Sequence, residues 1–209
     1  MKDNEYHKSR SGVAAELSAE WGPGFFFNTL IGDSDFLRFN LGVRAFLPLF
    51  DVAPDRPVNL FCGYLADFFA VDYAVGFAAP VPLAIRQTFG GRNPQTGLGY
   101  AVRGVSWADY DTNLKAVNNL ELRLELPALY IPDLVPGIIV FLDAGFYDQV
   151  GEAGIPAPTP MGIIASTGIG ISLDVLDLVT GAGYVDYRID SENPNGGRWS
   201  LAVEASLHF

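Results

Sequence analysis

The stretch that decides the fold is Trp199-Ser-Leu-Ala-Val-Glu-Ala-Ser-Leu-His-Phe209. Its odd-numbered positions, from Trp199 to Phe209, are all apolar, and its even-numbered positions are small or polar. A strict period of two places these two sets of side chains on opposite faces of a β-strand. The segment therefore predicts a strand with one apolar face and one hydrated face.

Seven further segments share this alternation, and residues typical of turns bound each of them. The clearest pattern precedes Pro127, where every second residue from Leu120 to Leu126 is leucine and the residues between are polar. In another segment the apolar set includes Cys62 and Phe68, and it opposes Asp67. The sequence thus predicts an all-β chain of eight strands. They are expected at about residues 12–22, 36–48, 57–70, 113–127, 136–148, 162–175, 178–190 and 197–209.

Strand length and composition favour a membrane barrel over a soluble sheet. Hydrophobic residues make up 49% of the 209 residues, yet no stretch approaches the ~20 apolar residues of a membrane helix. Strands of roughly 10–13 residues suit a tilted crossing, and bacterial single-chain barrels have an even strand number. We expect residues 12–209 to form a transmembrane antiparallel β-barrel of eight strands. A soluble sandwich or a lipocalin-like barrel with a large core is the alternative.

Charge and reactive residues argue against several functional classes. The net charge of −11 disfavours nucleic acid as a partner, because phosphate contacts need patches of Lys and Arg. Cys62 is the only cysteine, so there is no disulfide framework and no zinc-type cluster. Asp109, Asp111 and Asn113 lack the glycine and distal glutamate of a calcium loop. No metal and no cofactor are expected. A lipase or protease is disfavoured because no nucleophile and base are placed together.

The two ends of the chain bear on its location. Residues 1–11 lack the apolar core of a signal peptide, and we expect a disordered tail or a remnant of cloning. Bacterial outer-membrane barrels need an export signal, which we expect to have been removed. They typically end on an aromatic residue in the strand that closes the barrel seam, as Trp199 and Phe209 would here. The sequence therefore predicts a protein of the bacterial outer membrane, in contact with the lipid bilayer.

Residues 71–112 lack sustained alternation and are rich in glycine and proline, which predicts a long loop. A loop of this length in a compact domain is usually functional or disordered. Short motifs occur in the loop and in the two predicted strands that follow it. They are Phe89-Gly-Gly91, Val102-Arg-Gly-Val105, Glu121-Leu-Arg-Leu-Glu-Leu-Pro127 and Phe141-Leu-Asp-Ala-Gly145.

These motifs, in this order, resemble the carboxy-terminal half of the BamA/TamA-type surface-antigen barrel family, which includes outer-membrane insertases and two-partner secretion transporters. The likeness covers essentially the whole chain, with three predicted strands before the loop and five after it. It implies membrane protein assembly or protein transport: insertion, assembly or translocation of client proteins at the outer membrane, without enzymatic activity. The family's insertases also carry POTRA domains, which these 209 residues lack. A structural or anchoring barrel, or a narrow pore, is therefore the alternative.

The resemblance further implies that the loop enters the barrel lumen, where carboxylates of the wall hold its arginine. The alternation places Glu121 and Asp143 on faces that would both point inward. Val105 departs from the family pattern, which has an aromatic residue there, and Arg103 as a solvated loop residue is the alternative. The residues that the motif match assigns to this clamp are Arg103, Gly104, Glu121, Asp143 and Gly145.

An eight-stranded barrel raises a geometric problem, because its interior is just wide enough for its own side chains. A loop of about 30 residues would not also fit inside. Three arrangements stay open. The loop could lie over the mouth of a closed barrel, two chains could pair as a homodimer through 12–22 and 197–209, or the chain could be a piece of a longer protein.

Overall fold

The computed structural model describes residues 11–23, 35–52, 61–77, 81, 102–105, 112–129, 134–148, 161–176, 179–189 and 198–207. Within these ranges the chain is all-β, with eight strands and no helix, as predicted. No helix in this part of the chain has the length and apolarity needed to cross a bilayer. The strands are β1 (Gly12–Gly22), β2 (Phe36–Val52), β3 (Phe61–Gly76), β4 (Leu114–Glu125), β5 (Leu134–Asp148), β6 (Met161–Val175), β7 (Val179–Arg188) and β8 (Trp199–Leu207).

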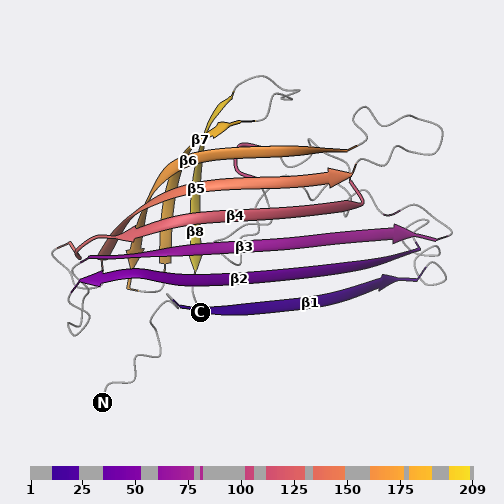
Figure 1. The fold of residues 1–209 in the computed structure, drawn as a ribbon, viewed down its shortest axis with the longest axis horizontal. Coiled ribbons are helices and arrows are strands. Elements are labelled where there is room, and N and C mark those ends of the chain that lie inside the picture. The colour runs from indigo at the N-terminus through magenta and orange to yellow at the C-terminus, as the bar shows by residue number, and fades with distance from the viewer. Residues whose placement is uncertain are drawn as a thin grey trace, which may run out of the picture.

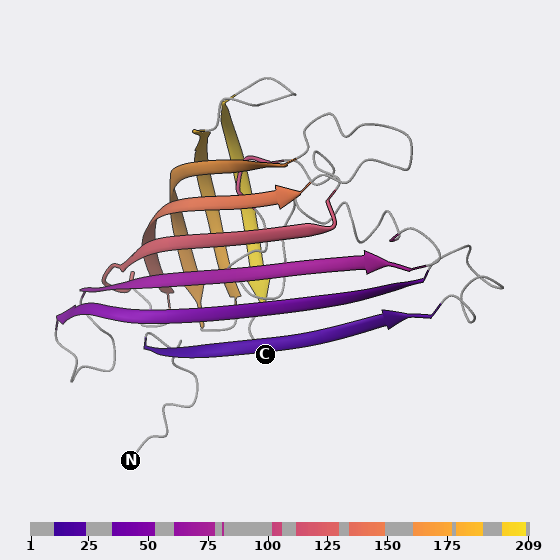
Figure 2. The ribbon, with the colours of Figure 1, turned by 45° about the vertical axis from the view of Figure 1, so that its right-hand side comes forward.

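The eight strands form one antiparallel sheet in which every strand pairs with its neighbours in sequence, in the order β1 to β8. The sheet is strongly curved. In both views β1 to β5 lie side by side, and β7 and β8 cross behind them, so the sheet has a concave and a convex face (Figures 1 and 2). Among the described residues β1 and β8 do not pair with each other. The described sheet is therefore open along two edges, which agrees with the predicted eight antiparallel strands but does not close them into a barrel.

The predicted strand bounds agree with the structure to within a few residues, except in the region of β2 and β3. β2 continues to Val52, and β3 begins at Phe61 and continues to Gly76, six residues into the predicted loop 71–112. The period of two is weak there because the concave face carries the small apolar residues Ala70 and Ala74 on either side of Asp72, opposite Val71 and Val75. Alanine contrasts little with valine in hydrophobicity, so the alternation is hard to detect in the sequence.

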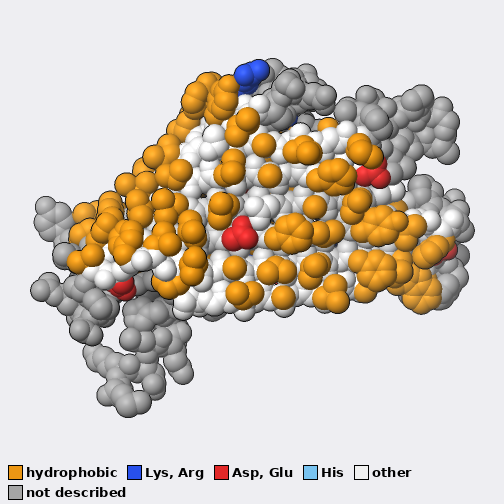
Figure 3. Space-filling model, viewed as in Figure 1, with side chains coloured by type: hydrophobic (Ala, Val, Ile, Leu, Met, Phe, Trp, Pro, Cys, Tyr) orange, Lys and Arg blue, Asp and Glu red, His pale blue; other side chains and the backbone are white. Residues whose placement is uncertain are grey.

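The convex face of the sheet is predominantly apolar. Figure 3 shows hydrophobic side chains spread across the face that β1 to β5 form. Monomeric soluble proteins rarely expose contiguous apolar patches of more than a few hundred Å². Large apolar side chains on this face that are more than half exposed come from β1, β2, β6 and β8. They are Val13, Leu17, Trp21, Leu47, Met161, Ile163, Ile169, Ile171, Trp199, Leu201 and Val203.

The concave face has the opposite character and holds buried polar and charged side chains. The register places several of them level with one another across the sheet: Asp143 of β5 lies opposite Asn119 of β4 and Ser166 of β6. The buried polar residues that point to this side are Asp72, Lys115, Asn119, Glu121, Asp143, Ser166, Asp174, Asp186 and Arg188.

The central strand β3 departs from this arrangement. Its apolar set, which includes Tyr64, Ala66 and Phe68, is buried on the concave side, and Asp67 points to the convex side. The guanidinium of Arg44 lies 5.7 Å from the centre of the Phe68 ring. The alternation in the predicted strand 57–70 thus separates the two faces correctly, but here the apolar set is the inner one.

Candidate functional site

Residues 102–105 lie against the concave face, far in sequence from the strands that they contact. The backbone N–H of Val105 donates to the carbonyl oxygen of Val102 at 3.2 Å, which closes a tight turn. Gly104 has a φ of 82°, in the left-handed region that glycine enters without steric cost. A Cβ at Gly104 would also overlap the carboxylate of Asp186 and lie 3.3 Å from Oγ of Ser200. Only glycine fits this position, on both grounds.

The two valines of the turn anchor it in an apolar cluster. Val102 and Val105 are buried together with Val117 of β4, Tyr147 of β5 and Ile164 of β6. Val105 occupies the position where the resemblance leads one to expect an aromatic residue. The aromatic residue of the apolar cluster is instead Tyr147, which belongs to β5.

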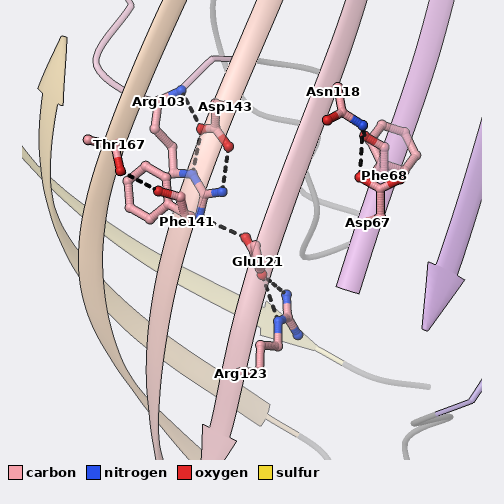
Figure 4. Close-up of polar contacts among 9 residues, drawn as sticks. All are labelled: Asp67, Phe68, Arg103, Asn118, Glu121, Arg123, Phe141, Asp143 and Thr167. Carbon is pink, nitrogen blue, oxygen red and sulfur yellow. Dashed lines mark hydrogen bonds and ion pairs between the residues drawn. The ribbon is translucent and has the colours of Figure 1, made fainter. Parts of the chain in front are cut away.

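Arg103, at the tip of the turn, contacts two carboxylates of the sheet (Figure 4). Its Nε and Nη2 donate to Oδ2 and Oδ1 of Asp143, both at 2.7 Å, and its backbone N–H donates to Oδ2 at 3.0 Å. Its Nη1 lies 2.7 Å from Oε1 of Glu121. The Arg103 side chain is 12% exposed, and the two carboxylates are 0% and 1% exposed. The structure thus brings together the arginine and the two carboxylates that the motif match assigns to one site.

Aromatic rings complete the binding site of the guanidinium. The Arg103 guanidinium carbon lies 3.6 Å from the ring centre of Phe141 and 5.2 Å from that of Tyr184. The two rings meet edge to face, with centres 5.9 Å apart. A cation close to a ring face is attracted by the ring quadrupole, more strongly where water is excluded. Gly168 of β6 makes room for this arrangement, because a Cβ there would lie 2.6 Å from Cζ of Phe141.

A second arginine extends the network along the wall. Nε of Arg123 donates to Oε2 of Glu121 at 2.6 Å, so Glu121 lies between two guanidinium groups. Two arginines and two carboxylates therefore balance in charge. We call Arg103, Glu121, Arg123 and Asp143 the clamp. Removing one member of a buried network leaves an uncompensated charge, which costs about 3–5 kcal/mol.

The charge state of Arg103 follows from these contacts. Burial of Arg103 acts to lower its pKa, but the hydrogen bonds and charges of Asp143 and the charge of Glu121 outweigh burial and raise the pKa above its ordinary value. The guanidinium therefore remains a cation. Both carboxylates of the clamp are engaged by guanidinium groups, so the clamp links the turn to the wall of the sheet.

The other residues predicted for the site lie elsewhere. Gly145 is on the concave face of β5, in register with Val117 and Ile164, and thus level with the apolar cluster rather than with the ion pairs. Trp199 begins β8, is 68% exposed on the convex face and has its ring centre 4.8 Å from that of Tyr187. Phe209 lies outside the described residues.

Two sets of polar contacts were not predicted from the sequence. On the concave face, Asp72 pairs with Arg38 and lies 3.5 Å from Nζ of Lys115. This pairing was missed because Asp72 falls in the predicted loop. On the convex face, Nδ2 of Asn118 donates to Oδ1 of Asp67 at 2.8 Å, a contact drawn in Figure 4. The described residues contain no group of His, Cys, Asp and Glu side chains that could hold a metal ion.

A scan against protein-family models, a search of curated proteins and a search of solved structures each returned no match for this chain. The motif resemblance and the geometry of the clamp are therefore what bear on function.

Proposed function

We propose that this chain is an integral β-barrel protein of the bacterial outer membrane, similar to the BamA/TamA-type family, that assists insertion, assembly or translocation of proteins at that membrane. One observation carries the proposal. An inward turn is fixed by Arg103 to Asp143 and Glu121 on the concave face of a sheet whose convex face is apolar.

The membrane location rests on the chemistry of the two faces. Leu201 is 82% exposed, Val203 80% and Leu17 77%, and all three lie on the convex face. Moving one such side chain from water into an apolar medium gains roughly 1.5–3 kcal/mol. A convex face of this kind is stabilised by lipid, whereas in water it would drive association.

The proposed activity rests on the open edges and the fixed turn. Unpaired strand edges accept an incoming strand by main-chain hydrogen bonding, which is how β-augmentation works. A seam between β1 and β8 would offer such edges to a client chain, and the clamp would keep the inner face rigid while the seam opens. We propose this as the mechanism, in line with what the family resemblance implies.

The test is whether the protein accelerates the folding of another outer-membrane barrel into lipid vesicles that contain it. The native chain is expected to increase the client's folding rate, measured by heat-modifiable gel mobility. Arg103→Ala is expected to abolish that increase. Arg44→Ala is the matched control, since Arg44 is also on the concave face but outside the clamp. Full activity of Arg103→Ala would contradict the role given to the clamp.

A second candidate function is a structural or anchoring barrel. The observation in its favour is the filling of the concave face, where Val102, Phe141 and Tyr184 are each under 5% exposed. Such packing is expected of a barrel whose lumen is filled by its own side chains. A chain that folds in vesicles but neither accelerates client folding nor conducts ions would be an anchor. Ion conductance without acceleration would indicate a narrow pore.

A further inference from the structure

We propose that two copies of this chain complete one barrel, with the β1 edge of each copy paired antiparallel to the β8 edge of the other. Two sheets of eight strands would then enclose a single lumen with sixteen strands in its wall. The proposal rests on the membrane location proposed above, and it adds the partner and the two seams.

The first argument is the hydrogen bonding of the edges. β1 has 11 residues and β8 has 9, and neither has a neighbour on its outer side among the described residues. In the hydrocarbon region each unsatisfied backbone group costs several kcal/mol, so closed barrels are the only β-structures that span a membrane. Both edges therefore need a strand beside them, and their similar lengths suit pairing with each other.

The second argument concerns the space inside one chain. Residues 102–105 already bridge the concave face, with Arg103 on Glu121 and Asp143, and Gly104 beside Asp186 and Ser200. An eight-stranded barrel holds little more than its own side chains. Drawing β1 onto β8 of the same chain would have to tighten the sheet around a turn that already contacts β4, β5, β7 and β8. A partner sheet closes both edges without that contraction.

The third argument is the exposure of the inner side of β1. Glu16, Ser18 and Glu20 point to the concave side, in register with residues 42, 40 and 38 of β2, yet all three are exposed. The corresponding residues of β4 and β5, Glu121 and Asp143, are buried. The concave-side residues of β1 therefore face space that one chain does not fill, as expected for a wider lumen that two chains share.

The direction and faces of the edge strands are compatible with this pairing. Strands alternate in direction from β1 to β8, so β8 followed by β1 of a second copy continues the antiparallel order. A two-fold axis along the barrel makes both seams identical, and two-fold dimers are the commonest closed assemblies. Trp21 near the end of β1 and Trp199 at the start of β8 would lie at the same rim on the outer face. Tryptophan is enriched at membrane interfaces.

The pairing predicts a disulfide that forms only between chains. In a Cys62→Ala background, a cysteine is placed on the outer face of β1 at Ala15, Leu17 or Ala19. In a second preparation it is placed on β8 at Leu201, Val203 or Ala205. The two preparations are folded together into vesicles and oxidised. At least one β1 and β8 combination is expected to give a cross-linked product of twice the chain mass in high yield. Ala144→Cys, on the outer face of central strand β5, is the control and is expected to give none with any β8 variant.

The outcomes separate the pairing from the proposed function. Heat-modifiable mobility of the same samples reports insertion independently of cross-linking. A further preparation carries both cysteines on one chain. If this chain inserts and cross-links only within itself, at monomer mass, the pairing is overturned and the membrane location stays intact. Insertion without any cross-link would also overturn it, since another molecule would then occupy the edges. Failure to insert would overturn both proposals.

Discussion

At the scale of single residues, the turn at Gly104 and the clamp at Arg103 depend on each other. Gly104 allows the backbone to approach Asp186 and Ser200, and that approach brings the Arg103 guanidinium over the Phe141 ring. Asp143 receives three hydrogen bonds from Arg103, one of them from its backbone. The turn is therefore held by main chain and side chain together, so small changes here are expected to have large effects.

Arg103→Ala is predicted to lower the free energy of unfolding by about 3–5 kcal/mol, because it leaves Asp143 buried without its partner. Urea titration of the chain in vesicles, followed by tryptophan fluorescence, measures this change. The double variant Arg103→Met/Asp143→Leu is expected to lose less than the sum of the single variants. Additive losses would contradict the direct coupling of the two side chains.

Gly104→Ala is predicted to destabilise the fold by roughly 1–3 kcal/mol, because alanine would be strained at a φ of 82° and would overlap Asp186. Gly181→Ala is the control, since a Cβ at Gly181 meets nothing within 4 Å. The same urea titration compares the two variants. Equal effects from both would show that the turn is not held in the described conformation.

Asp67→Leu is predicted to stabilise the chain in vesicles, by roughly 1–2 kcal/mol, because it removes a carboxylate from the middle of the apolar convex face. Acidic atoms surrounded by hydrophobic side chains are visible on this face in Figure 3. The matched variant Asp72→Leu is expected to destabilise, since it removes the carboxylate that lies between Arg38 and Lys115 on the concave side. Destabilisation by Asp67→Leu would instead indicate that the hydrogen bond from Asn118 to Asp67 outweighs the cost of a carboxylate on this face.

At the scale of elements, the sequence predicts strands well where the two faces differ and poorly where they do not. β1 agrees with its predicted range, 12–22, because small and acidic residues separate its apolar ones. The second half of β3 falls in the predicted loop because the small residues Ala70 and Ala74 on its concave face contrast little with Val71 and Val75 on its convex face. Which face of β3 points inward is decided by contacts of Phe68 with its neighbours in space, which one sequence does not display.

The candidate site could be predicted from the sequence only in part. The motif match selected Arg103, Glu121 and Asp143, and the alternation placed both carboxylates on inward faces. The role of Arg123 was not foreseen, although its two-residue spacing from Glu121 on one strand was visible in the sequence. The aromatic support from Tyr184 could not be anticipated, because it comes from β7, which lies far away in sequence.

A separate prediction concerns β6, whose glycines accommodate aromatic rings of neighbouring strands. In Gly168→Ala the new Cβ would overlap the backbone carbonyl oxygen of Val185 and lie 2.6 Å from the Phe141 ring, so the change is expected to shift β6 against β7 and to weaken the contact of Phe141 with Arg103. We expect a loss of roughly 1–3 kcal/mol, as in other overpacked sites. Protease accessibility of residues 102–105 in vesicles measures the release of the turn. Unchanged protection would contradict the link between β6 and the turn.

At the scale of the whole molecule, an open sheet with an apolar convex face and an ionic concave face would expose a large apolar surface and two strand edges to water. The most exposed apolar residues of β1 and β8 lie on the two edge strands of the described sheet, so the most apolar part of its surface coincides with its two edges. Lipid on the convex face and a strand at each edge would satisfy both. The membrane proposal and the pairing of two copies answer these separate requirements.

The measurement that tests the central claim most directly is folding of the purified chain into vesicles with brominated acyl chains. We predict acquisition of β-structure by circular dichroism, heat-modifiable mobility and strong quenching of tryptophan fluorescence, since Trp21 and Trp199 are 61% and 68% exposed on the convex face. Single Trp→Phe variants assign the quenching to each position. A stable, monomeric β-fold in lipid-free buffer, with tryptophans that brominated lipid leaves unquenched, would contradict the account.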